Sequence, residues 1–244
     1  IPSIEGVAMA SMLFGGAGIE HQQKYGTKKE TFAKITVKAR KHAEHNERAI
    51  FRNLVTLEEV LASPMQAPPL TRLQCCPPTC GAAAAIVCSD EFAKKHNISK
   101  PIYIAAQSMY TDFPSAFESR SPMSIIGYDM TAAAAKEVYE KSGIGPEEVN
   151  VVELHDCFTC NELVTYEALG LTPEGTAEKF IEDGDNTYGG RIVTNPSGGL
   201  LSKGHPLGAT GLAQCAELVW QLRGEAGVRQ VEDARIGLQQ NIGL

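Results

Sequence analysis

Two short segments of the sequence gather side chains that can do chemistry. The first is HDCF at residues 155–158, which sets an imidazole, a carboxyl group and a thiol side by side. The second is GHPLGATG at residues 204–211, in which a histidine stands among glycines and next to a proline. Histidine serves as a base or a hydrogen-bond donor near neutral pH, and cysteine can carry a proton or act as a nucleophile. The two segments therefore predict proton-transfer or thiol chemistry, provided that the fold brings them together.

The HDCF segment lies where a predicted strand, residues 149–154, gives way to a predicted helix, residues 158–169. In α/β sheets ligands bind at this edge, because loops converge there and helix N-termini point at the ligand. Two interpretations stay open. Either His155, Asp156 and Cys157 belong to a reactive site, or Asp156 caps the helix while its neighbours pack.

The GHPLGATG segment reads as a loop that holds its histidine in place. Its glycines permit positive φ angles and close backbone approach, and Pro206 stiffens the chain beside His205. The helix that follows aims its positive end at the loop, which suits a histidine acting as a base or an oxyanion donor. The G-K-[ST] ending of a phosphate loop and the G-x-G-x-x-G spacing of a dinucleotide site are both absent. The competing interpretation is a tight turn with a solvated histidine.

Strands and helices alternate through the second half of the chain, which predicts an α/β fold with a covered sheet. The predicted strands are residues 81–87, 101–106, 149–154 and 235–238, and the predicted helices are residues 92–96, 130–142, 158–169 and 212–222. We expect Asp129 or Thr131 to cap the helix at residues 130–142, and Gly143 to end it.

The part of the chain before Pro69 is polar and rich in helix formers. Residues 28–53 predict surface helices rather than part of a sheet core. We expect His42 and His45, which have no reactive neighbours in the sequence, to lie in solvent.

The composition narrows the class of protein. Against 29 Asp and Glu the chain has 22 Lys and Arg, for a formal net charge of −7 and no basic run. Nucleic acid is therefore a poor partner, although a local patch could still bind an anionic ligand. No apolar stretch reaches the length of a membrane span.

The seven cysteines are an odd number in a chain of 244 residues. They do not predict a secreted disulfide scaffold, and they indicate a reducing, intracellular compartment. Cys75, Cys76 and Cys80 raise the alternative of a zinc site. Their spacing does not give two C-x₂-C pairs, so we expect no metal.

Taken together, HDCF and GHPLGATG resemble the thiolase family, and specifically its sterol-carrier-protein-2 branch of 3-ketoacyl-CoA thiolases. The segments NELVTYEALGL, GDNTYGG, CGAAAAIVCS and NPSGGLLSKGHPLGATGLAQCAELVWQLRGEAG resemble that branch as well. The resemblance implies a thiolase fold of layered α/β halves (αβαβα). Residues 1–69 would be part of an inserted loop domain, residues 70–97 the end of the N-terminal half, and residues 98–244 the C-terminal half without its final strand.

The resemblance also implies roles for individual residues. His205 would activate a nucleophilic cysteine, and His155 would donate a hydrogen bond to the enolate oxygen. Cys157 would be the acid/base thiol, since QNIG at residues 240–243 lacks the cysteine of the Cys-x-Gly motif that most thiolases carry. The N–H of Gly243 would complete a second oxyanion hole.

Cys76 would line the channel for the pantetheine arm of coenzyme A. The family places the nucleophilic cysteine upstream of the loop domain. We therefore expect it outside these residues, and we assign that role to none of the remaining cysteines.

The function implied is thiolytic cleavage of a branched or sterol-type 3-oxoacyl-CoA, an acyltransferase reaction of lipid metabolism. Coenzyme A would be a co-substrate, no cofactor would be bound permanently, and the enzyme would be a homodimer in peroxisomes. Mitochondrial or cytoplasmic locations are alternatives, and a fused lipid-transport domain is sometimes present in this branch. Two other functions stay open, namely a catalytically dead subunit that binds acyl-CoA or a partner, and a thiolase-fold retro-aldolase.

Overall fold

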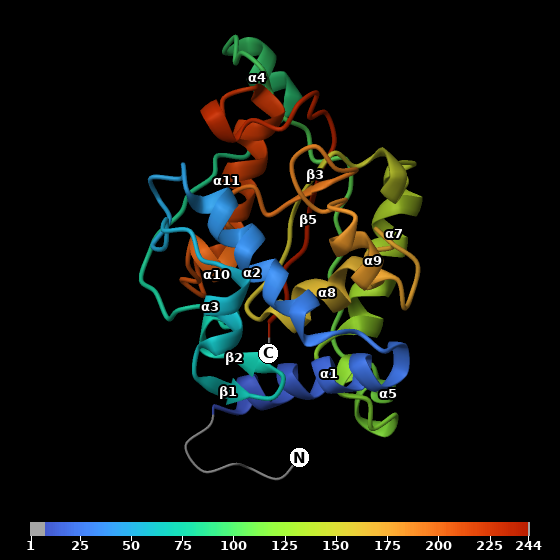
Figure 1. Ribbon diagram of the computed structural model, residues 1–244. Helices are drawn as coiled ribbons and strands as arrows, with labels where there is room; N and C mark the ends of the chain where they lie inside the picture. Colours follow the sequence, from blue (N-terminus) through green and yellow to red (C-terminus); the bar gives the residue numbers. More distant parts are fainter. Residues whose placement is uncertain (1–7, 244) are drawn as a thin grey trace.

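A computed structural model describes residues 8–243 of the chain. Its centre is a parallel sheet in the order β4-β3-β5, formed by β3 (Val151–Glu153), β4 (Val193–Thr194) and β5 (Gly237–Gln239) (Figure 1). Val151 is in register with Val193 on one side and with Gly237 on the other. The predicted strands at residues 149–154 and 235–238 are therefore confirmed as β3 and β5.

The two faces of this sheet bury different sets of side chains, because successive residues of a strand point to opposite sides. Val152 and Leu154 join the larger core cluster. Val151 joins a smaller one with Val193 and with Leu218 of α11 (Thr210–Arg223). Helices thus cover both faces, and the predicted α/β class with a covered sheet is confirmed.

Helix α8 (Thr159–Ala168) is buried along its whole length. The helices α1 (Met9–Tyr25), α2 (Lys29–Ala43) and α7 (Tyr128–Ser142) all contact it. A Cβ built on Gly18 of α1 would lie 2.4 Å from the sulfur of Cys160, so α1 approaches α8 this closely only because a glycine stands there. The helices predicted at residues 130–142, 158–169 and 212–222 are confirmed as α7, α8 and α11.

The start of α7 differs from the prediction. Its N-cap is Gly127, at φ +93°, and neither Asp129 nor Thr131 caps it. Its end agrees with the prediction, since Gly143 closes it in the left-handed conformation.

Helix α2, within the residues 28–53 predicted as surface helices, packs against the interior. Helix α2 buries Phe32 and Ile35 completely. The prediction that His42 lies in solvent is wrong, since its ring is buried and bonded to the Asn195 carbonyl at 3.0 Å and to the Thr187 hydroxyl at 2.7 Å. The polar composition of α2 hid this packing, because many of its polar side chains bind other polar groups in the interior. The exposed position of His45 agrees with the prediction.

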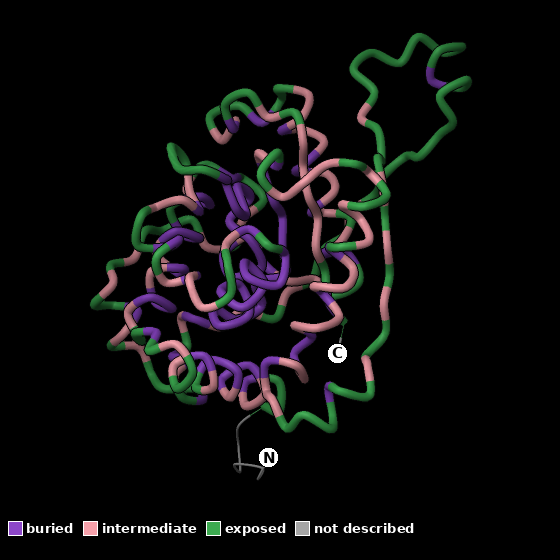
Figure 2. The backbone as a smooth tube through the Cα atoms, turned by 90° about the vertical axis from the view of Figure 1, so that its right-hand side faces the viewer, coloured by how far each residue is buried: buried purple, intermediate pink, exposed green. Residues whose placement is uncertain are grey.

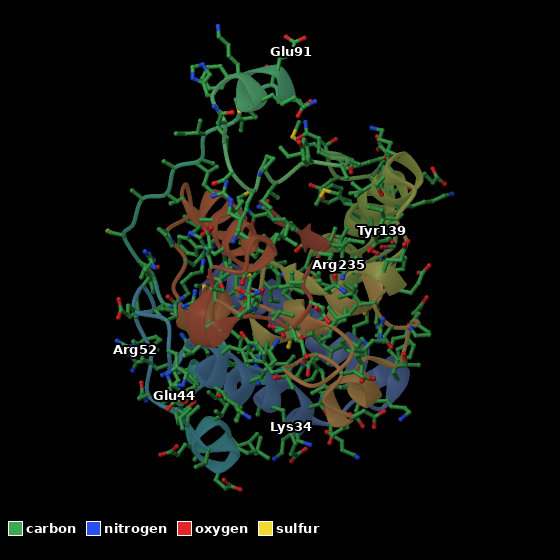
Figure 3. The ribbon with its side chains drawn as sticks, turned by 90° about the horizontal axis from the view of Figure 1, so that it is seen from above. Lys34, Glu44, Arg52, Glu91, Tyr139 and Arg235 are labelled. Atoms are coloured by element: carbon green, nitrogen blue, oxygen red, sulfur yellow. The ribbon has the colours of Figure 1, made fainter. Side chains whose placement is uncertain are left out.

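The strands predicted at residues 81–87 and 101–106 are wrong. Neither segment forms a strand, and Ile86 and Ile104 are 95% and 69% exposed. Figure 2 shows this exposed stretch projecting from the buried interior, and Figures 1 and 3 place α4 (Asp90–Lys95) at its outer end. An apolar run forms a buried strand only where other strands pair with it, and none does so within the described residues.

Short elements complete the described chain. They are α3 (Leu57–Ala62), β1 (Met65–Ala67), β2 (Leu70–Thr71), the 3₁₀ turn Arg72–Gln74, α5 (Pro114–Glu118), α6 (Pro122–Ile125), the 3₁₀ turn Pro146–Glu148, α9 (Ala177–Glu182), α10 (Gly199–Ser202) and the 3₁₀ turn Gly227–Arg229. Within residues 8–243, no helix has both the length and the apolar character that crossing a bilayer requires.

Candidate active site

The imidazole rings of His155 and His205 meet edge to face. Their centroids are 4.9 Å apart and their planes make an angle of 85°. His155 lies two positions after the end of β3, and His205 stands in the loop between α10 and α11. The two histidine segments, 50 positions apart in the chain, therefore converge beyond the carboxyl end of the central strand, where α/β folds bind ligands.

The backbone after β3 is fixed by two amide side chains. The N–H of Leu154 donates to Asn195 Oδ1 at 2.8 Å, and the N–H of His155 donates to Gln240 Oε1 at 3.1 Å. Asn195 follows β4 and Gln240 follows β5. Both neighbouring strands therefore hold the position of His155.

Asp156 joins the HDCF segment to the segment that leads to His205. Its carboxylate accepts hydrogen bonds from the backbone N–H groups of Leu200, at 2.7 Å, and Leu201, at 3.4 Å, in the first turn of α10. The hypothesis that Asp156 caps the helix after HDCF is therefore wrong, since α8 has Phe158 as N-cap and no side-chain cap. Burial, reinforced by the charge of Glu162, raises the pKa of Asp156 to about 7.

His155 is neutral at physiological pH. Its side chain is only slightly exposed, and Nδ1 lies 2.5 Å from the side-chain amide of Asn241. Burial lowers the pKa of His155 to about 4, against the opposing effect of the Asn241 hydrogen bond and with a small contribution from His205. Its Nε2 makes no hydrogen bond to any described residue, so this nitrogen is available to a ligand.

His205 is half-buried and is held from two sides. Nδ1 lies 2.7 Å from Thr210 Oγ1, and the backbone N–H donates to Thr79 Oγ1 at 2.5 Å. The ring is therefore not a freely solvated side chain. Burial, with the nearby charge of Lys203, lowers the pKa of His205, which favours the neutral imidazole that a base requires.

Cys157 and Cys76 lie side by side on adjoining segments of the chain. The N–H of Cys76 donates to the carbonyl of Cys157 at 2.8 Å, and the adjoining pair Cys75 and Phe158 forms an antiparallel bridge. Burial raises the pKa of the Cys157 thiol well above its usual value and that of Cys76 to about 12. Both sulfurs are thus protonated at neutral pH, which suits a proton donor better than a resting nucleophile.

An open hollow of about 460 Å³ adjoins His205. It is lined by Thr79, Cys80, Gly81, Ala82, Ala83, Pro206, Leu207, Gly208 and Ala209. Residues 206–209 of the GHPLGATG loop and residues 79–83 therefore face each other across this hollow, and neither histidine is part of its lining.

Gly243 adjoins Ile242, whose backbone N–H points at His155 Nδ1 at 3.5 Å. No atom lies within 4 Å of a Cβ built on Gly243, so its surroundings are open. In the cysteine cluster, the Cys75 thiol donates to the Thr71 carbonyl at 3.4 Å and Cys80 is exposed. Across residues 8–243, no set of three or more His, Cys, Asp and Glu side chains is arranged to hold a metal ion.

A buried ionic network behind the site was not predicted. The ammonium group of Lys38, on α2, pairs with the carboxylate of Glu162 on α8 and donates to Thr194 Oγ1 at 2.7 Å. Asn195 Nδ2 donates to the other carboxylate oxygen of Glu162 at 3.4 Å. This network ties α2 and α8 to the end of β4, next to the residue that holds Leu154.

Four further residues escaped the prediction, namely Thr79, Thr210, Gln240 and Asn241. Thr210 lies inside GHPLGATG, and Gln240 and Asn241 lie inside QNIG, so the motifs contained them without indicating their contacts. Thr79, Gln240 and Asn241 bond to residues far away in the chain, and such hydrogen bonds have no local signal in a sequence, whereas Thr210 bonds to His205 within its own motif.

Comparison with known proteins gives the chain its relatives. Residues 116–244 match the family model described as "Thiolase C-terminal domain-like". Sterol carrier protein 2 of Rattus norvegicus is 59% identical over 236 residues, which are 96% of this chain and 43% of the rat protein. Benzoylsuccinyl-CoA thiolase subunit BbsB of Thauera aromatica is 48% identical over 207 residues, which are 85% of this chain and 53% of that subunit.

Among solved structures, the Ltp2-ChsH2(DUF35) aldolase superposes with a TM-score of 0.79 at 27% identity, covering 96% of this chain and 60% of that one. The chain thus spans less than half the length of the rat relative that it matches. These matches confirm the predicted resemblance and fold class. The domain boundaries at residues 69 and 97 and the roles of the individual site residues stay predictions.

Proposed function

Because the chain belongs to the thiolase family, we propose that it supplies the acid–base half of a 3-oxoacyl-CoA thiolase active site. The observation that carries this proposal is the edge-to-face contact of the His155 and His205 imidazoles, whose centroids are 4.9 Å apart, with the protonated thiol of Cys157 two positions after His155 in the chain. The reaction proposed is thiolysis, in which coenzyme A as co-substrate cleaves a 3-oxoacyl-CoA with a branched or sterol-type chain.

The chemistry divides into two steps. A cysteine elsewhere in the full-length protein loses its proton to His205, and its thiolate adds to the C3 carbonyl of the substrate. The C2–C3 bond then breaks, leaving an acyl group on that cysteine and an enolate that Cys157 protonates at C2. In the second step the thiol of coenzyme A, deprotonated by the Cys157 thiolate, takes the acyl group and releases the cysteine.

His155 has a separate part in this scheme. As the enolate forms, negative charge grows on the thioester oxygen, and a hydrogen bond from His155 stabilises it. Its low pKa supports this role, because a neutral donor binds the thioester without a proton being exchanged in the ground state. Cys76 borders Cys157 and would line the path of the pantetheine arm, and the N–H of Gly243 would serve the other oxyanion.

The test is turnover of a 3-oxoacyl-CoA and coenzyme A by the full-length protein, with the products separated by chromatography. His205→Ala is expected to lower kcat about 10²–10⁴-fold, since a general base contributes on that scale. His45→Ala, at an exposed position away from the site, is the matched control and keeps wild-type turnover. Wild-type kcat in His205→Ala would remove the role of that ring.

A retro-aldolase is the second candidate function, favoured by the similarity to an aldolase structure over 96% of the chain. Such an enzyme breaks the C2–C3 bond of a 3-hydroxyacyl-CoA, as the C3 hydroxyl loses its proton and the enolate gains one. It needs an enolate site and no nucleophilic cysteine. Product formation from the 3-hydroxy substrate in the absence of free coenzyme A would favour the aldolase, whereas strict dependence on coenzyme A favours the thiolase.

The remaining proposals concern the assembled protein. A catalytically inactive acyl-CoA-binding subunit would bind the substrate in a calorimetric titration while showing neither reaction. We place the full-length protein in peroxisomes as a homodimer, with a lipid-transport domain as an additional part. Fluorescence colocalisation and light scattering after gel filtration test the location and the dimer.

A further inference from the structure

Asn195 interrupts the hydrogen-bond ladder between β4 and β3. Its N–H donates to the Val152 carbonyl at 2.7 Å, as the next rung of this parallel pair requires. In a parallel ladder the carbonyl of the same residue accepts from the N–H two positions further along the neighbouring strand, which here belongs to Leu154. The Asn195 carbonyl instead accepts from the Gly198 N–H at 2.9 Å and from His42 Nδ1 at 3.0 Å. The Leu154 N–H therefore needs another acceptor.

The backbone of Asn195 turns the chain away from the sheet. Its φ is +52°, in the left-handed region that asparagine adopts more readily than most residues other than glycine. Such a conformation costs free energy, and in a fully buried residue it persists only because the surroundings require it. The turn leads through Gly198, the N-cap of α10, to the loop that carries His205. The conformation of Asn195 therefore sets the path of the chain toward the second histidine.

The side chain of Asn195 replaces the carbonyl that the turn removes. Oδ1 accepts from the Leu154 N–H at 2.8 Å, and Nδ2 donates to Glu162 Oε2 at 3.4 Å. A backbone N–H can only donate, and a carboxylate paired with the Lys38 ammonium can only accept, so both contacts demand the same orientation of the amide. The amide is thus fixed at both of its ends. Since Leu154 is the residue before His155, the amide also fixes the backbone that carries this ring.

We infer that Asn195 is a positioning residue for both imidazoles of the candidate site. Its side chain holds Leu154, and so the adjoining His155, while its turned backbone directs the chain that carries His205. Asparagine suits this position because it combines a tolerated left-handed backbone with an oxygen that reaches Leu154, whereas glycine offers only the backbone. That the placement of the two rings matters for thiolysis rests on the proposed function.

Asn195→Gly distinguishes the role of the side chain from that of the turn. Glycine accepts the left-handed backbone and keeps the main-chain bonds, but it removes the acceptor of the Leu154 N–H. We expect kcat to fall about tenfold or more with KM within about threefold, because a misplaced catalytic group slows the chemical step. Asn186→Gly is the matched control, since Asn186 is also buried and its amide donates to the Tyr166 hydroxyl at 3.1 Å. The control should keep the wild-type kcat even if it lowers stability.

The double variant Asn195→Asp with Glu162→Gln exchanges the amide and the carboxylate between the two positions. The carboxylate at position 195 still accepts from the Leu154 N–H, and the amide at position 162 supplies the donor between the two side chains. The total charge of the buried cluster stays the same, and aspartate also tolerates the left-handed backbone. This variant should therefore keep kcat within about threefold of the wild type, because the acceptor of Leu154 is restored.

Hydrogen exchange of the full-length protein, measured by mass spectrometry on peptides that span residues 151–158, tests the contact without any assay of activity. The Leu154 N–H should be protected in the wild type, and Asn195→Gly should speed its exchange about tenfold relative to Asn186→Gly.

Four results would overturn the inference, and two of them come from hydrogen exchange. These two are rapid exchange of the Leu154 N–H in the wild type, and equal exchange in the two glycine variants. The other two are a wild-type kcat in folded Asn195→Gly, and a kcat of the folded double variant more than about tenfold below the wild type. If the wild type does not cleave a 3-oxoacyl-CoA, the proposed function fails, and hydrogen exchange still decides whether Asn195 holds Leu154.

Discussion

The carboxylate of Asp156 fills the space where a side chain on Gly199 would begin. A Cβ built on Gly199 would lie 2.0 Å from Asp156 Oδ2, and Gly199 itself has a φ of +61°. The carboxylate can accept the N–H groups of α10 only from this position. The link between the two histidine segments therefore depends on the absence of a single methyl group.

Gly199→Ala is expected to destabilise the protein by about 3 kcal/mol or more, since it adds a clash with a buried carboxylate to the strain of a left-handed alanine. Gly224→Ala is the matched control, because Gly224 has a similar φ of +73° and no atom within 4 Å of its built Cβ. Strain alone should cost about 1 kcal/mol there. Chemical denaturation measures both, and equal losses in the two variants would contradict the close contact.

The raised pKa of Asp156 makes stability depend on pH in a defined direction. Its folded pKa of about 7 exceeds the ordinary aspartate value of about 3.9. Between these values the folded state holds a proton that the unfolded state has lost, so this contribution is full below pH about 4 and disappears as pH rises through about 7. Asp156→Asn should remove it, and the wild type should lose stability relative to the variant by up to about 1 kcal/mol per pH unit in that window.

Denaturation curves recorded across this pH range for the wild type and for Asp156→Asn supply the measurement. Glu153, whose pKa burial raises to about 8, titrates in both proteins and cancels in the difference. A difference that is flat with pH, or that grows in the opposite direction, would refute the protonated carboxyl.

The sequence predicted well those elements whose formation depends on residues within the same segment. The helix at residues 130–142 ends at Gly143 as expected, and the strand at residues 149–154 contains β3. The two failed strands, at residues 81–87 and 101–106, have equally strong apolar patterns. What they lack is a paired neighbour within the described residues, and strand formation depends on pairing that no local pattern encodes.

The sequence predicted the reactive side chains of the candidate site. It did not predict the residues that hold those side chains in place. His155 and His205 stand in motifs whose residue types suggest chemistry, and their rings do meet. Thr79 and Asn241, which hold those rings, are ordinary polar residues far from their partners in sequence. His42 was assigned to solvent because its partners at Thr187 and Asn195 become neighbours only in the fold.

Removal of the Lys38 ammonium should destabilise the protein far more than an equivalent change at the surface. Lys38→Met leaves the fully buried carboxylate of Glu162 without its cation, which costs about 3–5 kcal/mol. Lys34→Met, one turn earlier on α2 and labelled in Figure 3, breaks a partly exposed pair with Glu182 and should cost less than about 1 kcal/mol. Thermal unfolding measures the stability of both variants. Similar losses of stability would mean that the buried pair of Lys38 and Glu162 contributes no more than the partly exposed pair of Lys34 and Glu182.

Adding Glu162→Gln to Lys38→Met distinguishes two causes of the lost stability, namely the unpaired charge of Glu162 and the lost packing of the Lys38 side chain. The second change removes the buried negative charge that the first left uncompensated, so the double variant should recover part of the lost stability. If the double variant were less stable than Lys38→Met, the lost stability would come from lost packing and hydrogen bonds, including those of Thr194.

The exposed apolar stretch between residues 81 and 106 should govern how the 244-residue chain behaves by itself. Apolar side chains this exposed and this close in sequence form a surface that water solvates poorly, and such surfaces mark association sites. We therefore expect the chain to associate at low micromolar concentration and to bind a hydrophobic dye. Ile86→Lys combined with Ile104→Lys should reduce both effects, because each charge interrupts the apolar run without touching the core.

Val228→Lys is the control for this last prediction, since Val228 is 79% exposed on the turn after α11, outside the projecting stretch. It changes the net charge in the same sense, by one unit, and should leave association almost unchanged. Light scattering against concentration distinguishes the variants. If Val228→Lys alone dispersed the chain as well as the double variant does, net charge rather than the projecting stretch would be the cause. If neither dispersed it, association would arise from another face of the molecule.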